Sequence, residues 1–519
     1  MLLRRTRRII RKTAEVTKDN CINRTKLAKT TFQGNRKEGS FFMGEKEQFF
    51  AELTRYKEAL RVDASFDVVA RVFMVSDKQA ALFFIDGMIK DETMQKLMQG
   101  FATIKPADMP ENAAMFAKYQ IPYVEVEVLP DMQTAINSVL SGAPCLLIEG
   151  YGQAISIDIR TYPARSVGEP EKDKVMRGSR DGFVETLVFN TALIRRRIRD
   201  PKLTMEYCNV GTVSHTDIAL CYMTDRVDEK YLTEIRRRLK NISVESLTMN
   251  QESLAECLYD SSWWNPFPKF KFSERPDTAS AAVLEGNIVI LVDNSPAAMI
   301  LPTSIFDIIE EADDYYFPPV TGTYLRLTRV AANILAFILT PLFLLLMQQP
   351  ERLPESLAFI ALKEPLNIPL VWQFLLLEFA IDGLRLAALN TPSMLSLPLS
   401  VISALVIGEF AVSSGWFNAE PLLYMSFVIL ANYTQASYEL GYAIKFLRMI
   451  TLVLTHFFGV WGFFGGVALM ILCICTNKAI GGKSYVFPLF PLHFKKLMKR
   501  FFRVSLTHES KNQGGNVRQ

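Results

Sequence analysis

The stretch that decides the architecture is LRLTRVAANILAFILTPLFLLLM, residues Leu325 to Met347. It carries Arg326 and Arg329 near its start and then no charged residue from Val330 onward. The 18 residues from Val330 to Met347 are mostly apolar, which is long enough for a helix to cross the hydrocarbon core of a bilayer. The stretch therefore predicts a transmembrane helix and, with it, an integral membrane protein.

Comparable apolar stretches follow toward the C-terminus: Ile368 to Leu389, Met394 to Val412 and Ile450 to Cys475. The intervening region, Pro421 to Met449, is interrupted by polar residues and glycine, so it fits a span, a re-entrant segment or an interfacial one. We expect residues 319–476 to form an all-α transmembrane helical bundle of four to six membrane segments. Four glycines in the last stretch suit close helix packing, with a flexible gate as the alternative; they are Gly459, Gly462, Gly465 and Gly466.

The residues before this bundle alternate between strand and helix patterns, which is typical of an α/β fold. In the first part we expect helices at Glu45 to Leu60, through Ile89 and Leu97, and at Met132 to Leu140, and strands at Asp67 to Val75, Tyr123 to Leu129, Cys145 to Glu149 and Ala154 to Ile159. These elements predict a first α/β cytoplasmic subdomain at 43–165. A polar stretch with glycine and proline follows, and it predicts a linker at 166–180.

A second series of elements predicts a second α/β cytoplasmic subdomain at 181–318. We expect helices at Gly182 to Arg199 and Glu229 to Leu239, strands at Met205 to Val210 and Asp217 to Met223, and a hairpin-like pair at Ala281 to Leu284 and Asn287 to Val292. The predicted fold class is therefore an α/β cytoplasmic region of two subdomains, followed by the helical bundle.

Basic residues are concentrated at the two ends of the chain. Residues 1–42 hold 12 Lys and Arg against three acidic residues, although the whole chain has a net charge of only +4. We expect a basic disordered arm there, and we leave open whether the protein begins at Met1 or at Met43. Residues 477–519 form a basic tail whose segment Phe487 to Val504 suits either the lipid headgroup region or an ordinary surface helix. Basic residues at both membrane edges favour cytoplasmic N- and C-termini and an even number of spans.

Several classes of function are disfavoured by the residues present. The seven cysteines form no CxxC pair, and the four histidines are widely scattered, which disfavours a disulfide framework and a zinc site. No nucleotide-binding loop, metalloprotease motif or hydrolase elbow occurs in a strand-to-helix context. We expect no enzyme, no cofactor, no metal and no nucleic-acid partner.

Charged residues inside the apolar stretches are the candidate functional residues. Spacings of four and three place Glu378, Asp382 and Arg385 on one face of a helix, and Glu409 lies in the next stretch. Charges at this depth are costly and usually face the bundle interior or water. Counted together, these four residues carry −3 + 1 = −2, a balance that favours cations in an aqueous path. The alternative is a bridge from Arg385 to Asp382 or Glu409 that holds helices together.

Two charged runs in the soluble part are candidates for subunit contacts. Arg195, Arg196 and Arg197 fan out around a predicted helix, which fits a solvated face, or contact with an anion or another subunit. The acidic run just before the first span is their natural opposite partner across a subunit boundary, with a flexible hinge or a metal site as alternatives; it comprises Glu310, Glu311, Asp313 and Asp314.

Several long segments of the chain resemble the GerA family of spore germination receptor A subunits. They are RGSRDGFVETLVFNTALIRRRIRDPKL (Arg177 to Leu203), NPFPKFKFSERPD (Asn265 to Asp277), LEGNIVILVDNSPAAMILPT (Leu284 to Thr303), EADDYYFPPVTGTYLRLTR (Glu311 to Arg329), SALVIGEFAV (Ser403 to Val412) and YELGYAIKFLRM (Tyr438 to Met449). The resemblance runs from about Asp67 to Pro491 and leaves out the basic arm.

The resemblance implies a location in the spore inner membrane, with the N-terminal region in the spore core. It also implies a ring oligomer, a pentamer, that conducts monovalent cations and works with a small membrane partner and other germination proteins. The last two segments favour the sporulation branch of the family, which would amplify ion release, over a nutrient receptor A subunit. A non-conducting membrane scaffold for germination proteins is the alternative from a different class.

Overall fold

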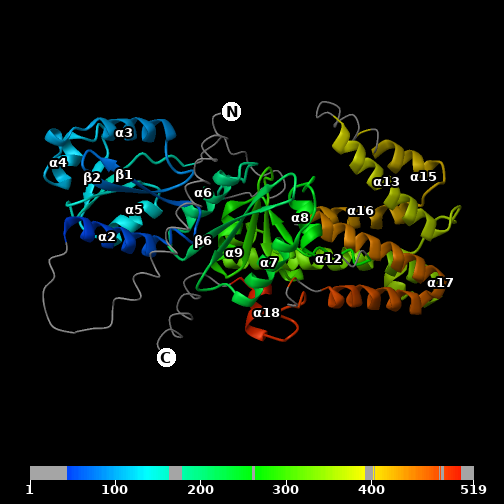
Figure 1. The fold of residues 1–519 in the computed structure, drawn as a ribbon. Coiled ribbons are helices and arrows are strands. Elements are labelled where there is room, and N and C mark those ends of the chain that lie inside the picture. The colour runs from blue at the N-terminus through cyan, green and yellow to red at the C-terminus, as the bar shows by residue number, and fades with distance from the viewer. Residues whose placement is uncertain are drawn as a thin grey trace.

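The computed structural model describes residues 44–162, 178–259, 264–391, 401, 404–435, 437–477, 480 and 484–503. The predicted arm at 1–42, the alternative start at Met43, most of the predicted linker, about half of the third apolar stretch and the end of the basic tail at 504–519 lie outside these residues. Figure 1 shows the described part as two α/β units followed by a region made only of helices.

The first unit is a five-stranded antiparallel sheet with helices on both faces. Its elements are α2 (Glu45–Leu60), β1 (Val68–Val75), β2 (Lys78–Ile85), α3 (Asp91–Thr103), η1 (Pro106–Asp108), α4 (Ala113–Tyr119), β3 (Val126–Leu129), α5 (Met132–Leu140), β4 (Cys145–Ile148) and β5 (Ala154–Ile157). The strand order is β1-β2-β4-β5-β3. Buried side chains of α2 and α5 pack on one face of the sheet and those of α3 and α4 on the other.

The second unit repeats this design. Its elements are α6 (Leu187–Arg197), β6 (Leu203–Val210), β7 (Thr216–Met223), α7 (Glu229–Asn241), α8 (Gln251–Leu258), β8 (Lys271–Ser273), α9 (Pro276–Leu284), β9 (Ile288–Val292) and β10 (Ala298–Leu301). The strand order is β6-β7-β9-β10-β8, which matches the first sheet strand for strand. Helices α6 and α9 cover one face, and α7 and α8 the other, so the two subdomains share one topology.

Most of the expected elements are present, but one segment was given the wrong structure and several elements were not predicted: β2, α4, α8, β8 and β10. Strand β2 was missed because its apolar residues, KQAALFFI, form a short continuous run that periodicity cannot separate from a buried helix. The segment Ala281 to Leu284, predicted as a strand, is the end of helix α9, which has Pro276 at its first position. The true hairpin partner of β9 is β10, with Met299 opposite Ile290.

The helical region follows the second sheet. Its elements are α10 (Ile305–Ile309), α11 (Asp313–Tyr316), α12 (Pro319–Gln348), η2 (Pro350–Arg352), η3 (Glu355–Ile360), α13 (Leu370–Asn390), η4 (Ala404–Phe410), α15 (Ala411–Ser413), α16 (Ala419–Tyr433), α17 (Tyr438–Thr476) and α18 (Phe494–Phe501). Within the described residues, α12 and α17 are long and apolar enough to cross a membrane. The structure thus has an α/β region of two sheets and then a helical region with two long apolar helices.

Helix α17 is a hairpin of two arms that reverses at Gly459, where φ is 57° and ψ is −129°. This left-handed conformation is costly for any residue with a Cβ. The second arm packs on the first through glycine, because a Cβ at Gly462 would collide with the carbonyl oxygen of Leu454, and one at Gly466 with Thr451. These two glycines therefore serve close helix packing, whereas a Cβ at Gly465 would meet open space.

Hydrogen bonds fix where the arms of α17 end. Gln348, at the end of α12, donates to the carbonyl oxygens of Thr455 (3.1 Å) and His456 (3.3 Å) beside the reversal. At the other end Asn265 of the second subdomain donates to the carbonyl of Cys473 at 2.9 Å. The reversal thus lies at the far end of α12, and the second arm returns to the α/β region.

Candidate functional site: charged clusters in the helical region

Four charged side chains from α13 and α17 meet between the helices, and we call Glu378, Asp382, Lys445 and Arg448 the interhelical cluster. Arg448 pairs with Glu378 at 2.5 Å, and Lys445 lies 3.4 Å from the same carboxylate. Lys445 also pairs with Asp382. The guanidinium of Arg448 donates in addition to the carbonyl oxygen of Ala336 on α12 at 2.5 Å, so the cluster joins three helices.

The interhelical cluster is neutral, and it is almost fully buried except for Asp382, whose side chain is 33 % exposed. Arg448 is 0 % exposed and Glu378 2 %. A buried ion is tolerable only when an opposite charge and hydrogen bonds compensate its lost hydration. The count of −2 from the sequence omitted Lys445 and Arg448, which lie far along the chain. With these two cations included, the net charge of the cluster is zero, so Glu378 and Asp382 add no excess negative charge that would attract a passing cation.

Arg385 does not make the bridges that its spacing suggested. Its guanidinium lies over the rings of Tyr433, at 5.7 Å, and Tyr442, at 5.3 Å. No ion pair from Arg385 to Asp382 or Glu409 is present among the described residues. The predicted bridges are therefore wrong for this conformation. Lys445, on a neighbouring helix, reaches Asp382 directly and forms the ion pair with it. Arg385 forms cation–π contacts with the tyrosine rings instead.

Glu409 has a different environment from Glu378. It lies in η4, a π-helical segment, and such segments in helices are rare and frequently mark functional sites. Its side chain is exposed, and the described side chains from Val406 to Ser414 include none that is buried. Glu409 forms no ion pair with any residue that the structure describes. It is an exposed carboxylate in an otherwise apolar segment.

The acidic run before α12 forms a second set of ion pairs, which we call the junction cluster: Glu310, Glu311, Asp314, Arg326, Arg329 and Arg500. Glu310 pairs with Arg326 (2.5 Å) and with Arg500 of α18 (2.6 Å). Arg329 pairs with Glu311 (2.6 Å) and Asp314 (3.0 Å). Asp314, 0 % exposed, also lies 3.3 Å from Arg326. Within this chain the acidic run therefore pairs with cations of α12 and α18. The predicted contact of the run with the α6 arginines of another subunit stays a prediction.

The arginines of α6 contact their own chain. Arg195 is fully buried and holds Asp67 of the first subdomain at 2.7 Å, so it is not available to another subunit or to solvent. Arg196 lies 4.4 Å from the centre of the Tyr162 ring. Arg197 pairs with Asp181 at 3.0 Å. The predicted solvated face is therefore wrong for Arg195, because its side chain points into the contact between subdomains.

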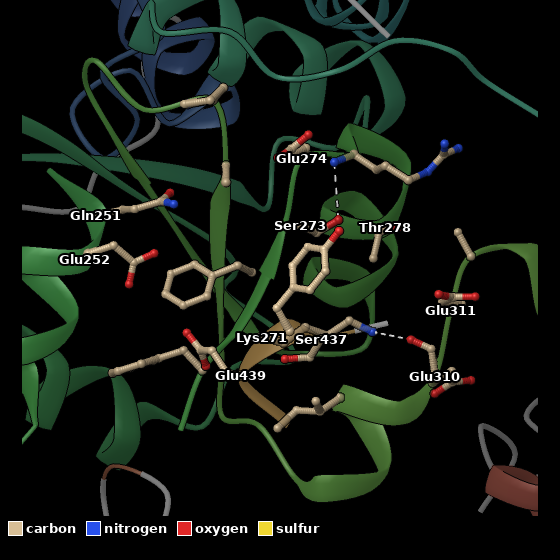
Figure 2. Close-up of a pocket in the computed structure, with 18 of the residues that line it drawn as sticks. Gln251, Glu252, Lys271, Ser273, Glu274, Thr278, Glu310, Glu311, Ser437 and Glu439 are labelled. Atoms are coloured by element: carbon tan, nitrogen blue, oxygen red, sulfur yellow. Dashed lines mark hydrogen bonds between the residues drawn. The ribbon is translucent and has the colours of Figure 1, made fainter. Parts of the chain in front are cut away.

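Asp313, the remaining acidic residue of the run, lines a cavity of about 250 Å³ that the sequence did not reveal. Its walls come from the start of α8, from β8, from residues 310–313 and from the start of α17. Figure 2 shows Lys271 reaching across it toward Glu310, and the Nζ donates to the backbone carbonyls of Asp307 (2.7 Å) and Glu310 (2.9 Å). The cavity joins the second sheet to the residues that lead into α12 and α17.

Burial alone would raise the pKa of Glu310, but Arg500, Arg326 and Lys271 together lower it below the ordinary 4.5. A carboxyl group with a lowered pKa adds stability above its unfolded-state pKa and loses it as pH falls through the folded-state value. We therefore expect the contact between α18 and Glu310 to be constant between about pH 5 and 8 and to weaken only below pH 4.5.

Hydrogen exchange of the amides around Arg500, corrected for the intrinsic rate at each pH, measures this contact. In a Glu310→Gln variant the acid-dependent part should be smaller but not absent, because Arg500 also pairs with Asp307. An increase in exchange already near pH 6 would contradict the assignment.

Comparison with known proteins gives the context for these clusters. The family described as Bacillus/Clostridium GerA spore germination protein matches residues 55–514. This chain belongs to the GerA family. The expectation from its sequence segments is confirmed.

This GerA chain is also similar to individual proteins. It is 34 % identical to stage V sporulation protein AF of Bacillus subtilis (strain 168), over 87 % of this chain and 91 % of the relative. It is 26 % identical to the uncharacterized membrane protein YfkQ of the same organism, over 80 % of this chain and 81 % of that one. Among solved structures it is similar to the N-terminal domain of the A subunit of the Bacillus megaterium spore germinant receptor GerK3, with 27 % identity, a TM-score of 0.38, and coverage of 51 % of this chain and 98 % of that one.

The segments that resemble the GerA family coincide with the contacts described above. The first contains Arg195, and the second contains Asn265, which holds the end of α17. The segment Glu311 to Arg329 supplies most of the junction cluster, and Tyr438 to Met449 supplies both cations of the interhelical cluster. These GerA segments thus have structural roles that sequence spacing did not reveal.

Proposed function

We propose that this GerA protein is one subunit of a ring-shaped ion channel, a pentamer, in the spore inner membrane. Its α/β region lies on the spore-core side. The channel releases monovalent cations during germination and amplifies the germinant response, together with a small membrane partner protein and other germination proteins. The similarity to stage V sporulation protein AF supports the sporulation branch.

Contacts between helix ends support an arrangement of six membrane segments. On the far side Asn367 donates to the carbonyl of Gly415 at 3.1 Å, and Gln373 donates to Asn418 at 2.9 Å. On the α/β side Arg385 lies over Tyr442. In this arrangement α12 leads away from the α/β region, α13 returns, η4 and α15 lead away, α16 returns, and the two arms of α17 lead away and back. An even number places the basic tail in the spore core, as the positive-inside rule favours.

The observation that carries the proposal is the exposed carboxylate of Glu409. A charge that faced lipid at this depth would cost roughly 2.5–3.5 kcal/mol on the insertion scale, so an uncompensated carboxylate belongs beside water. Repeated around a ring of subunits, Glu409 forms a ring of carboxylates, which is a known basis of cation selectivity. The neutral interhelical cluster then holds α12, α13 and α17 together, and we propose this role for Glu378 and Asp382 in place of one in the ion path.

Conductance after reconstitution into planar bilayers tests the proposal. Glu409→Gln should lower the preference for cations over anions by roughly 5-fold, the equivalent of about 1 kcal/mol for a solvated charge near the ion. Glu355→Gln, which changes an exposed glutamate in η3, is the matched control and should leave selectivity unchanged. If Glu409→Gln leaves the selectivity unchanged, Glu409 does not line the ion path. If Asp382→Asn changes the selectivity while the fold stays intact, the interhelical cluster does line the path.

A second candidate is a non-conducting scaffold that gathers germination proteins. The neutrality of the interhelical cluster favours it, because intramembrane charges that only bind helices together need no water path. A protein that reconstitutes as a ring but passes no ions under any germinant signal would support the scaffold. Currents that appear only with a nutrient and its receptor partners would instead indicate a nutrient receptor A subunit.

A further inference from the structure

The residues that follow α17 fold back onto the start of α12, and we call Leu489–Arg503 the C-terminal segment. It contains α18. Arg500 pairs with Asp307 (2.5 Å) and Glu310 (2.6 Å) just ahead of the first span. The Phe501 ring lies 5.9 Å from that of Phe306. The C-terminal end of α18 is thus fixed to the protein by ion pairs and an aromatic contact.

Contacts with α12 fix the position of the C-terminal segment along the axis of that helix. Arg326 donates to the carbonyl of Lys499 at 3.0 Å, and the backbone N–H of Arg503 donates to the hydroxyl of Thr323 at 3.1 Å. From Thr323 to Val330, where the uncharged run begins, the helix rises roughly 10 Å. If α12 crosses the bilayer, α18 lies just outside the hydrocarbon, at the level of the lipid headgroups.

The N-terminal end of α18 and the residues just before it carry apolar side chains that nothing in the described chain covers. Phe490 is 74 % exposed, Leu492 64 % and Phe494 67 %. Exposed lysines lie between and beside them: Lys495, Lys496 and Lys499. Aromatic and aliphatic side chains interleaved with lysines at headgroup level are the pattern of an interfacial helix, which buries its apolar face among acyl chains and binds headgroups with its cations.

A cavity of about 570 Å³ is lined by residues of α9, of the junction cluster and of the C-terminal segment. Its acidic lining residues include Asp277 and Glu285. Most of its cationic lining residues come from the C-terminal segment: Lys496, Lys499, Arg500 and Arg503. This distribution favours an anionic group that approaches from the membrane surface.

We propose that the C-terminal segment is a membrane-surface anchor that binds anionic phospholipid. Lys495, Lys496 and Lys499 contact the headgroup phosphates, and Phe490, Leu492 and Phe494 insert among the acyl chains. Because Arg326, Glu310 and Arg500 link the segment to the start of α12, the state of the bilayer surface is transmitted to the first span. The inference shares with the proposed function only the placement of α12 in the membrane; it does not require conduction.

Photo-crosslinking of the full-length protein in vesicles tests the anchor. The benzophenone amino acid is placed at Phe490 or Phe494, and, as the control, at Phe50, which is 49 % exposed on α2 of the first subdomain. The vesicles contain phosphatidylcholine alone or phosphatidylcholine mixed with phosphatidylglycerol. Lipid adducts found by mass spectrometry should form at both test positions, more in the mixed vesicles, and not at Phe50.

Substitution of the lysines supplies the second measurement. Each of Lys495→Gln, Lys496→Gln and Lys499→Gln should lower the adduct yield in mixed vesicles by up to roughly 5-fold, and Lys240→Gln, an exposed lysine of α7, should not. Equal yields in the two vesicle types, or crosslinks to a second copy or to the chain's own residues in place of lipid, would overturn the anchor. If lipid adducts form in a protein that passes no current, the proposed channel function is overturned and the anchor is not.

Discussion

Arg448→Leu is expected to destabilise the helical region by roughly 3–5 kcal/mol, because it leaves the buried carboxylate of Glu378 with only Lys445, which Asp382 also needs. The variant also removes the donor to the Ala336 carbonyl on α12. The measurement is the free energy of unfolding of the full-length protein in detergent. Arg71→Leu, an exposed arginine of β1, is the matched control and should change it little.

A double variant separates ion pairing from packing. Glu378→Leu combined with Arg448→Leu removes one charge of each sign and leaves Lys445 with Asp382, so the buried region is again neutral. Since a buried pair is often replaceable by apolar residues at little cost, most of the lost stability should return. If the double variant is as unstable as the sum of the single ones, the charges do not act as a unit and the interhelical cluster is misassigned.

Arg195→Met is expected to destabilise the α/β region by a similar amount, roughly 3–5 kcal/mol, because it strands the buried carboxylate of Asp67. The guanidinium donates twice to that carboxylate, at 2.7 and 3.0 Å, and once to the hydroxyl of Ser65, at 3.0 Å. It also donates to the Leu203 carbonyl at the start of β6. No other side chain can supply this planar set of donors, so Arg195→Lys should recover only a part of the stability that Arg195→Met loses.

Hydrogen exchange locates this effect at the contact between the two subdomains. Phe66 donates its N–H to the carbonyl of Met205, and the Met205 N–H is bonded to the hydroxyl of Ser65. Both amides should lose protection in Arg195→Met and keep it in Arg199→Met, which changes an exposed arginine just beyond α6. Protection that persists at Phe66 and Met205 would show that the subdomains are held together by other contacts.

Much of the α/β region could be predicted because its signals are local. Met132 to Leu140 was predicted as a helix with the bounds that α5 has, since Asp131 caps it and its apolar residues recur at helical spacing. Strand β2 could not be predicted because its apolar run has no strand or helix period, and the end of α9 resembles a strand because its last four residues are apolar or small. The matching order of the two sheets could not be predicted, because strand pairing depends on contacts between distant segments.

The sequence predicted which charged residues are candidates for function, but not which residues they pair with. Spacing placed Glu378 and Asp382 on one helix face, yet it could not show that α17 brings Lys445 and Arg448 against them. Likewise the acidic run was recognised, but Arg326, Arg329 and Arg500 were not identified as its partners. Glu409 was predicted as an intramembrane charge, and the structure adds its exposure and its π-helical backbone.

The sequence by itself determined that a soluble α/β region precedes apolar helices, and its long segments determined membership in the GerA family. Hydrophobic run length and periodicity act within a few turns of chain, so they can be read without knowing the fold. Only the tertiary structure decided which charges of the helical region compensate one another and which has no ion pair among the described residues. Compensation depends on which helices pack together, and the low dielectric between them makes an opposite charge a few ångströms away decisive.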